Sequence, residues 1–274
     1  MHPFIPVEPT ERPGHYRLIV PKNLCVGLPD RLFMFGGVGL ASALAAVEHF
    51  TGRPTVWAAA QYLSYAKPGT ELDLEVIVPV AGKFNSQARV ITRARNPDGS
   101  DQEIIAVNAA LGSRPDSPHL QWAEMPAVPP PEDCREMQIR WQRDPDDMNS
   151  QWERRIAYGS FGRERGTEPP SKDGISRLWV RPSNPDLPID RLVLAVMADF
   201  LPAGVGNALG ANAGGNSLDN TIRYMNFVPT EWVLADIRIH AVHAGFAHGR
   251  VHLFAQDGTL LATASQSLIV RIHS

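Results

Sequence analysis

Alternating hydrophobic and polar positions recur in two separate parts of the chain. "TELDLEVIVPV" (70–80) alternates acidic residues or Thr with Leu and Val, and "WVLADIRIHAV" (232–242) repeats this pattern. A period of two is typical of a strand with one buried face. A Pro-containing turn precedes each segment, "YAKPGTEL" in the first half and "NFVPTEWV" in the second. The sequence therefore predicts two half-buried strands in equivalent positions.

The two halves also share a later hairpin. Asp98-Gly99 and Asp257-Gly258 are typical of tight turns between antiparallel strands. A strand pattern that ends in arginine follows each turn, over 103–114 and over 259–271. The chain therefore contains an internal repeat.

One apolar helix is predicted upstream of each set of strands, over 36–50 and over 188–201. Each half then consists of one buried helix and a long antiparallel meander. The repeat predicts an N-terminal domain over 13–115, a Pro-rich and charged linker over 116–149, and a C-terminal domain over 150–274.

A helix wrapped by an antiparallel sheet, twice in tandem, is an α+β fold of the double hotdog type. Two ferredoxin-like units are the alternative, but each would need two helices and the pattern predicts only one.

Composition narrows the choice of partners. The chain has 274 residues, 43% of them hydrophobic, and a formal net charge of -3, so it offers no general basic field for nucleic acid. Its apolar stretches are broken well before the length of a bilayer span, and its start has no secretory pattern. Two distant cysteines match no metal spacing. We expect a cytoplasmic protein with no membrane or nucleic-acid partner.

The last strand carries the first candidate for chemistry. Strict alternation places Gln266 on a face whose other members are apolar: Leu260, Ala262, Ala264, Leu268 and Val270. In "NSLDNTIRYMNF" (216–227), Asp219 stands at the start of a largely apolar strand. A buried carboxamide beside a carboxylate can orient a water for attack on a carbonyl. A purely structural role remains open, with Gln266 bonded to the backbone and Asp219 capping the preceding loop.

Three segments resemble the acyl-CoA thioesterase II family. They are "FGGVGLASALAAVE" (35–48), "LDNTIRYMNFVPTEWVLADIRIHAV" (218–242) and "DGTLLATASQSLIVRIH" (257–273). The resemblance covers both halves and weakens in the linker. It implies a double hotdog that hydrolyses an acyl-CoA to a free acid and coenzyme A. A homo-oligomer of double-hotdog units is compatible with it.

The resemblance also implies a catalytic set of an Asp, a hydroxyl residue and a Gln that position the attacking water. Carried over to this chain, the set falls on Asp219, His240 and Gln266, so His240 replaces the hydroxyl. Gly36 and Gly37 at the first helix start could let backbone N–H groups bind the substrate, or could serve helix packing alone.

Two other functions remain open on the sequence. A hotdog hydratase or dehydratase would need a histidine such as His240 or His243 facing an acid. A non-catalytic acyl-thioester or lipid binder would explain His240 in place of a hydroxyl. Four histidines lie between 240 and 252, but alternation puts His240 and His243 on opposite faces and no cysteine joins them, so we expect no metal and no cofactor.

Overall fold

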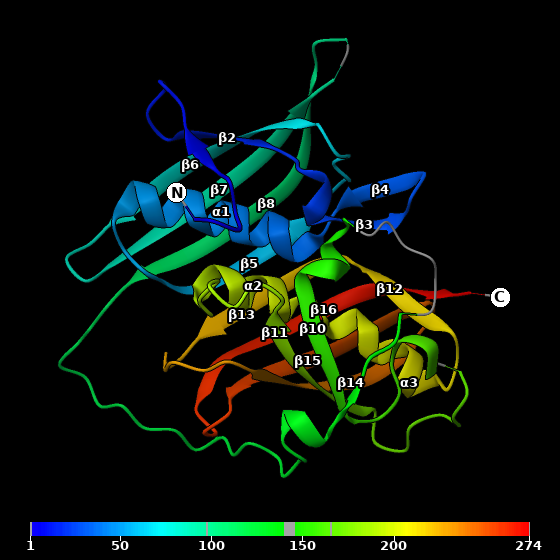
Figure 1. Cartoon of the computed structure of the whole chain (residues 1–274). Helices are drawn as coiled ribbons and strands as arrows, with labels where there is room; N and C mark the ends of the chain where they lie inside the picture. The colour runs from blue at the N-terminus through cyan, green and yellow to red at the C-terminus, as the bar shows by residue number, and fades with distance from the viewer. Residues whose placement is uncertain (1, 97, 140–145, 165, 274) are drawn as a thin grey trace. The chain divides into compact units, whose positions relative to one another are not determined.

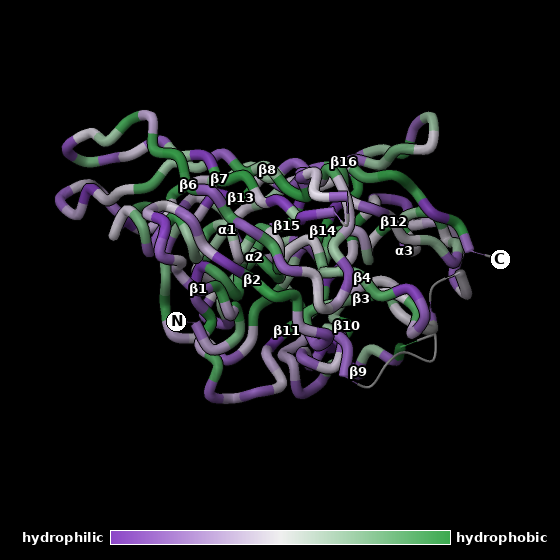
Figure 2. Tube along the Cα trace, turned by 90° about the horizontal axis from the view of Figure 1, so that it is seen from above, coloured by the Kyte–Doolittle hydropathy of each residue, from purple (hydrophilic) through white to green (hydrophobic). Residues whose placement is uncertain are grey.

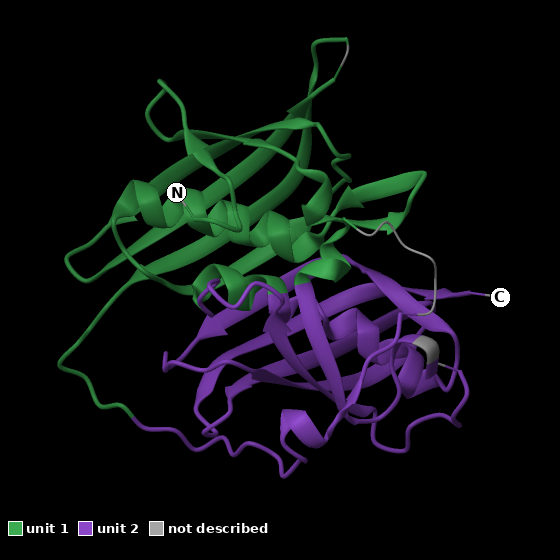
Figure 3. Ribbon diagram, viewed as in Figure 1, with its two compact units in different colours: residues 1–119, 143–151, 190–196 green, residues 120–142, 152–189, 197–274 purple. Residues whose placement is uncertain are grey.

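The computed structural model describes residues 2–96, 98–139, 146–164 and 166–273. It divides into two compact units, which Figure 3 shows in green and purple. Unit 1 comprises residues 1–119, 143–151 and 190–196, and unit 2 comprises residues 120–142, 152–189 and 197–274. The predicted domain boundaries stay a prediction, and residues 140–145 of the predicted linker lie outside the described residues.

Unit 1 is an antiparallel sheet with one long helix against it (Figure 1). Its sheet order is β1-β2-β6-β7-β8-β5, and β3 and β4 form a separate hairpin. The strands are β1 (Glu8–Pro9), β2 (His15–Ile19), β3 (Cys25–Leu28), β4 (Arg31–Met34), β5 (Thr55–Tyr62), β6 (Glu71–Ala81), β7 (Asn85–Arg95) and β8 (Asp101–Gly112). The helices are η1 (Lys22–Leu24), α1 (Gly36–Thr51) and η3 (Met148–Gln151).

Helix α1 is buried because nearly all of its middle is small or aliphatic, and it packs against β5 to β8. The helix lies close to the sheet at Gly39, where an added Cβ would lie 2.0 Å from Ile105 Cδ1. The helix ends at Gly52, whose φ of 65° is left-handed and favours glycine. This helix confirms the one predicted over 36–50.

Unit 2 has an antiparallel sheet of order β13-β16-β15-β14-β11-β10-β9, and β12 pairs with β16 beyond β13. The strands are β9 (Arg135–Glu136), β10 (Trp152–Tyr158), β11 (Ile175–Pro182), β12 (Ala213–Ser217), β13 (Asp219–Tyr224), β14 (Val233–His243), β15 (Phe246–Ala255) and β16 (Leu260–Ile272). The helices are η2 (Pro131–Asp133), η4 (Gly162–Glu164), α2 (Arg191–Ala198), η5 (Leu201–Gly204) and α3 (Val205–Leu209). Residues 191–196 of α2 are assigned to unit 1.

Hydrophobic and hydrophilic residues alternate along the long strands, as the colours of Figure 2 show. Strands β6, β8, β14 and β16 confirm the four strand predictions over 70–80, 103–114, 232–242 and 259–271. Gly99 and Gly258 have positive φ angles in the two predicted turns. Period-two patterning therefore found the longest strands correctly.

The second helix is shorter than its predicted range. The α-helix predicted over 188–201 is α2, Arg191–Ala198, and the glycine-rich stretch 203–215 after it forms the end of η5, α3 and the start of β12. Gly215 is needed in that strand, because a Cβ there would lie 2.2 Å from Leu268 Cδ1. The helical run Arg191–Leu209 is long and apolar enough to span a bilayer, but most of it is buried, as in a core helix.

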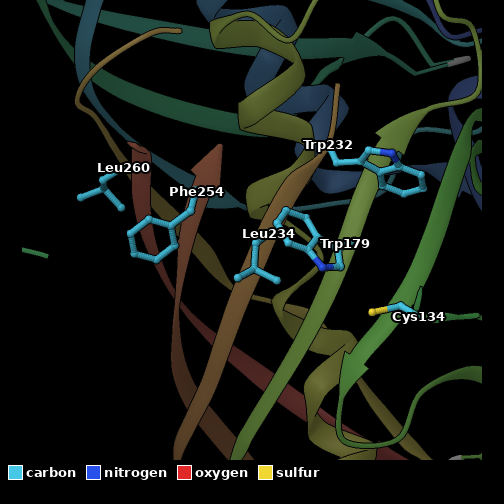
Figure 4. Close-up of a cluster of buried hydrophobic side chains, with 6 residues drawn as sticks. All are labelled: Cys134, Trp179, Trp232, Leu234, Phe254 and Leu260. Carbon is cyan, nitrogen blue, oxygen red and sulfur yellow. The ribbon is translucent and has the colours of Figure 1, made fainter. Parts of the chain in front are cut away.

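Part of the predicted linker is packed onto the sheet of unit 2. Residues 121–134, called here the covering segment, lie over an apolar cluster that Figure 4 shows: Cys134, Trp179, Trp232, Leu234, Phe254 and Leu260. Trp179 Nε1 donates to Pro129 O at 2.9 Å, and the Gln121 side chain bonds to Gly258 O and Leu260 N. These contacts hold the covering segment on the sheet of unit 2, and Pro131 and Cys134 are its buried residues.

Candidate functional site

The candidate site centres on a buried hydrogen bond in unit 2. Gln266 lies in the middle of β16 and is 0% exposed, as its place on an apolar face predicts. Its Nε2 donates to Asp199 Oδ1 at 2.7 Å. Asp199 directly follows α2 and is 4% exposed. Because a buried carboxylate is costly unless it accepts hydrogen bonds, Gln266 stabilises Asp199 in place.

Ser217 joins this pair from the end of β12. Its Oγ lies 3.0 Å from Asp199 Oδ1 and 3.4 Å from Gln266 Oε1. A hydroxyl has one proton, so the shorter contact marks Asp199 as its main acceptor. Ser217 is only partly buried, and it links the buried pair to solvent. We call these three residues the Asp199–Ser217–Gln266 group.

An irregularity between β12 and β13 positions Ser217. Ser217 pairs with Leu268 and Thr221 pairs with Ser265, so three residues lie opposite two. The extra residue is accommodated where Leu218 N donates to Ser267 O, and where Ser267 N donates to Asp219 Oδ1 at 2.7 Å. A side-chain oxygen thus replaces the backbone acceptor. Asp219 holds a β-bulge, a feature that commonly re-aims side chains beside functional sites.

Asp219 lies on the face of β13 opposite the one that packs with Gln266. Ile222 pairs with Ala264 on the buried face that also carries Gln266, whereas Asp219 alternates onto the opposite face with Thr221. The expected pairing of Asp219 with Gln266 is therefore replaced by the bond from Gln266 to Asp199. The physical reason is alternation along β13, which puts Asp219 and Ile222, three positions apart, on opposite faces.

His240 also lies away from the group. It stands at a register shift in β14 between Ile239 and Ala241, and it is exposed. Its ring packs edge-to-face on His248, 5.5 Å between centroids, and His248 pairs with Ser267 on the face opposite Gln266. Partial desolvation, then the positive charges of His248, Arg250 and Arg238, lower the His240 pKa. The hydroxyl beside Gln266 belongs to Ser217 instead.

Gly36 and Gly37 begin α1 in unit 1, directly after Phe35. Their role in substrate binding stays a prediction. Among the residues that the structure describes, no group of three or more His, Cys, Asp or Glu side chains could hold a metal ion.

Sequence reasoning missed Asp199 and Ser217. Asp199 had a usable signal, since it is an acid within the apolar helical run "LVLAVMADFL" (192–201), where carboxylates are almost never buried without partners. Ser217 had a weaker one, because it lies in the glycine-rich stretch that predicts a loop. The structure brings both side chains to Gln266.

Known proteins share this architecture. A family model described as the acyl-CoA thioesterase C-terminal domain matches residues 131–270, more than half of the chain. A structure from Novosphingobium aromaticivorans, assigned as a thioesterase, is 34% identical with a TM-score of 0.83, covering 96% of this chain and 97% of that one. No curated protein matches the sequence.

Two more distant structures show the fold. A conserved protein of unknown function with a hotdog fold from Alicyclobacillus acidocaldarius is 20% identical, with a TM-score of 0.81 and 98% and 96% coverage. An acyl-CoA thioesterase II from Mycobacterium marinum is 21% identical, with a TM-score of 0.72 and 98% and 97% coverage. The likeness spans nearly the whole length of each chain. With the family model and the 34% identical relative, it shows that this hotdog chain belongs to the acyl-CoA thioesterase family.

Proposed function

We propose that the chain hydrolyses acyl-CoA thioesters to a free acid and coenzyme A, with a water held by the Asp199–Ser217–Gln266 group. The observation that carries this proposal is the 2.7 Å bond from Gln266 Nε2 to Asp199 Oδ1 between two buried side chains. A carboxylate and a carboxamide fixed to each other offer two adjacent acceptors for one water. Membership of the thioesterase family supports the same activity.

In the proposed reaction, the water donates one hydrogen bond to Asp199 and one to Gln266 Oε1. Its oxygen then attacks the thioester carbon while Asp199 takes the proton. The tetrahedral intermediate collapses, the carbon–sulfur bond breaks, and the leaving thiolate of coenzyme A takes the proton from Asp199, which returns to its carboxylate form. Ser217 holds the carboxylate of Asp199 in its orientation. A thioester is electrophilic enough that a positioned water can act without a covalent nucleophile.

We also propose the double hotdog arrangement for the two units. Each unit contains a long antiparallel sheet with helical residues packed on it, α1 in unit 1 and η5 with α3 in unit 2. The helix-and-meander repeat of the sequence supports this arrangement.

The two alternative functions lose their main support. Within the described residues, the hydrogen bonds of Gln266 include no histidine, and His240 lies on the opposite face, so a hydratase pair of His and acid is not supported there. The non-catalytic binder was suggested by the missing hydroxyl, which Ser217 supplies.

The proposal is tested by thiol release from saturated acyl-CoAs of increasing chain length. The wild-type protein should release coenzyme A from at least one of them, and Gln266→Ala should be clearly slower because the water loses an acceptor. Ser217→Ala separates water attack from attack by serine. Partial activity in that variant is expected if Ser217 only orients Asp199, whereas complete loss would indicate a serine nucleophile. No thiol release from any acyl-CoA would contradict the proposed function.

A further inference from the structure

Asn220 is an unusual residue in the sheet of unit 2. Its side chain is 0% exposed, yet neither Nδ2 nor Oδ1 has a hydrogen-bond partner among the described residues. Buried polar atoms in native structures are nearly always paired, because an unpaired one loses its bonds to water without replacement. A buried amide of this kind therefore needs a reason, and a ligand that completes its hydrogen bonds is one.

The position of Asn220 connects it to the Asp199–Ser217–Gln266 group. Thr221 pairs with Ser265, so Asn220 and Gln266 each lie one position beyond this pair, next to the extra residue. Asn220 also shares the buried face of β13 with Ile222, whose partner Ala264 is on the face of Gln266. On neighbouring antiparallel strands, the Cβ atoms of opposed side chains are about 5 Å apart and those of diagonal neighbours about 7–8 Å apart, so the two side chains are neighbours.

The bulge explains why two polar residues flank Gln266. Without the extra residue, strict alternation would place Ser217 and Asn220 on opposite faces, since they are three positions apart. With Leu218 and Asp219 both turned away, Ser217 contacts Gln266 and Asn220 returns to the same buried face. The bulge therefore allows both Ser217 and Asn220 to lie on the face of Gln266.

The hydrogen bonds within the group leave at most the second N–H of Gln266 to donate to the substrate. The Ser217 hydroxyl and one N–H of Gln266 are directed at Asp199, and the proposed water uses acceptors only. The oxygen of a thioester carbonyl gains negative charge as water attacks, so it needs a fixed hydrogen-bond donor nearby. A neutral carboxamide supplies two N–H groups without competing for the proton that Asp199 receives.

We propose that Asn220 is a catalytic residue whose Nδ2 donates to the carbonyl oxygen of the acyl thioester and stabilises the oxyanion. This inference rests on the proposed function. It predicts that the unpaired amide destabilises the protein without substrate and becomes satisfied only when the thioester is bound.

The test compares Asn220→Leu with the wild type in two measurements, kcat for thiol release and the midpoint of thermal unfolding. Leucine is of similar length to asparagine but has no polar side-chain atoms. We expect kcat to fall by roughly a hundredfold, the usual effect of removing one oxyanion donor. The thermal midpoint should stay the same or rise, because an unpaired polar group has been removed from the interior.

Two further variants make the test decisive. Thr221→Val is a matched control on the opposite face of the same strand, and it should keep wild-type kcat. Asn220→Ala repeats the test with a smaller side chain in case leucine does not fit. Wild-type kcat in either Asn220 variant would overturn the inference, and so would a fall in kcat accompanied by a lower thermal midpoint in both, since that indicates a structural role. A wild-type protein that releases no thiol contradicts the proposed function, whereas an active wild type with fully active Asn220 variants contradicts this inference alone.

Discussion

Gln266 Nε2 donates to Asp199 Oδ1 at 2.7 Å, and this bond joins the middle of strand β16 to the residue directly after helix α2. Both side chains are buried, so their shared hydrogen bond is shielded from competing water. The same carboxylate oxygen accepts from Ser217 Oγ. A helix end and two strand positions thus converge on one carboxylate.

Asp219 should act on structure and not on proton transfer. Asp219→Ala removes the acceptor of Ser267 N and should destabilise the protein by about 1 kcal/mol, the net contribution of one hydrogen bond, because this bond is only partly buried. The bulge would relax, and thiol release should fall because Ser217 moves away from Gln266. Asp219→Asn retains an acceptor oxygen and should preserve both properties. Urea unfolding and thiol release on the two variants check this, and equal damage by Ala and Asn would contradict it.

Asp190 should stabilise the start of α2 and make unit 1 sensitive to acid. Its Oδ1 accepts from the N–H groups of Leu192 and Val193, and its Oδ2 lies 3.1 Å from His2 Nε2. Asp190→Ala should cost about 1 kcal/mol of unfolding free energy, while Asp190→Asn should cost less because it keeps a capping oxygen. Urea unfolding of both variants tests the cap.

The pKa of Asp190 gives the sign of the pH dependence. Burial alone would raise it, but the bonds from His2 and from the backbone lower it overall. A lowered pKa in the folded state means that the stabilisation is complete above the ordinary Asp pKa and is lost as pH falls through the folded value. Asp190→Ala should therefore lose less stability on acidification than the wild type, and an equal loss would contradict this assignment.

His240 should affect stability at mildly acid pH without affecting turnover. Its pKa is lowered by desolvation and by neighbouring positive charges, so the unfolded chain binds a proton more readily than the folded one. The stability that uncharged His240 contributes is complete above the ordinary His pKa. It is lost as the pH falls through the pKa of His240 in the folded protein. His240→Gln should flatten the change in urea midpoint between about pH 8 and about pH 5. Its rate of thiol release at neutral pH should match that of the wild type. Strongly reduced turnover would show instead that His240 takes part in the reaction.

The covering segment should depend on Trp179. Trp179→Phe keeps an aromatic ring in the cluster but removes the bond from Nε1 to Pro129 O, which should cost about 1 kcal/mol. Residues 121–134 should then be cut more readily by proteases, while thiol release stays near the wild-type rate. Unchanged proteolysis would show that this hydrogen bond does not hold the segment.

The strands could be predicted from the sequence because their patterning is regular. The apolar face of β16 is continuous through Ala264, Gln266 and Leu268, so alternation alone was enough to single out Gln266 as a buried polar residue. The long strands β6 and β14 follow from the same period of two.

The partners of Gln266 could not be predicted by counting, because bulges change the count. An extra residue near Asp219 reverses the face of the positions before it, and the register shift at His240 does the same in β14. Asp199 is 67 positions from Gln266 and approaches it from the end of a helix. Strand alternation carries no information about such a contact. Ser217 was not recognised because it follows glycines, which are typical of a loop. In the structure, Gly215 is instead required by the close packing of β12 on β16.

The role of Asp199 as the base can be measured by comparing Asp199→Asn with Asp219→Asn in the release of coenzyme A from one acyl-CoA that the wild type hydrolyses. Asparagine at 199 keeps an acceptor for Gln266 but cannot take a proton. We expect Asp199→Asn to lower kcat by roughly a hundredfold or more, the range for loss of a general base, and Asp219→Asn to stay near the wild-type rate. Normal turnover in Asp199→Asn together with loss of turnover in Asp219→Asn would show instead that Asp219 is the base.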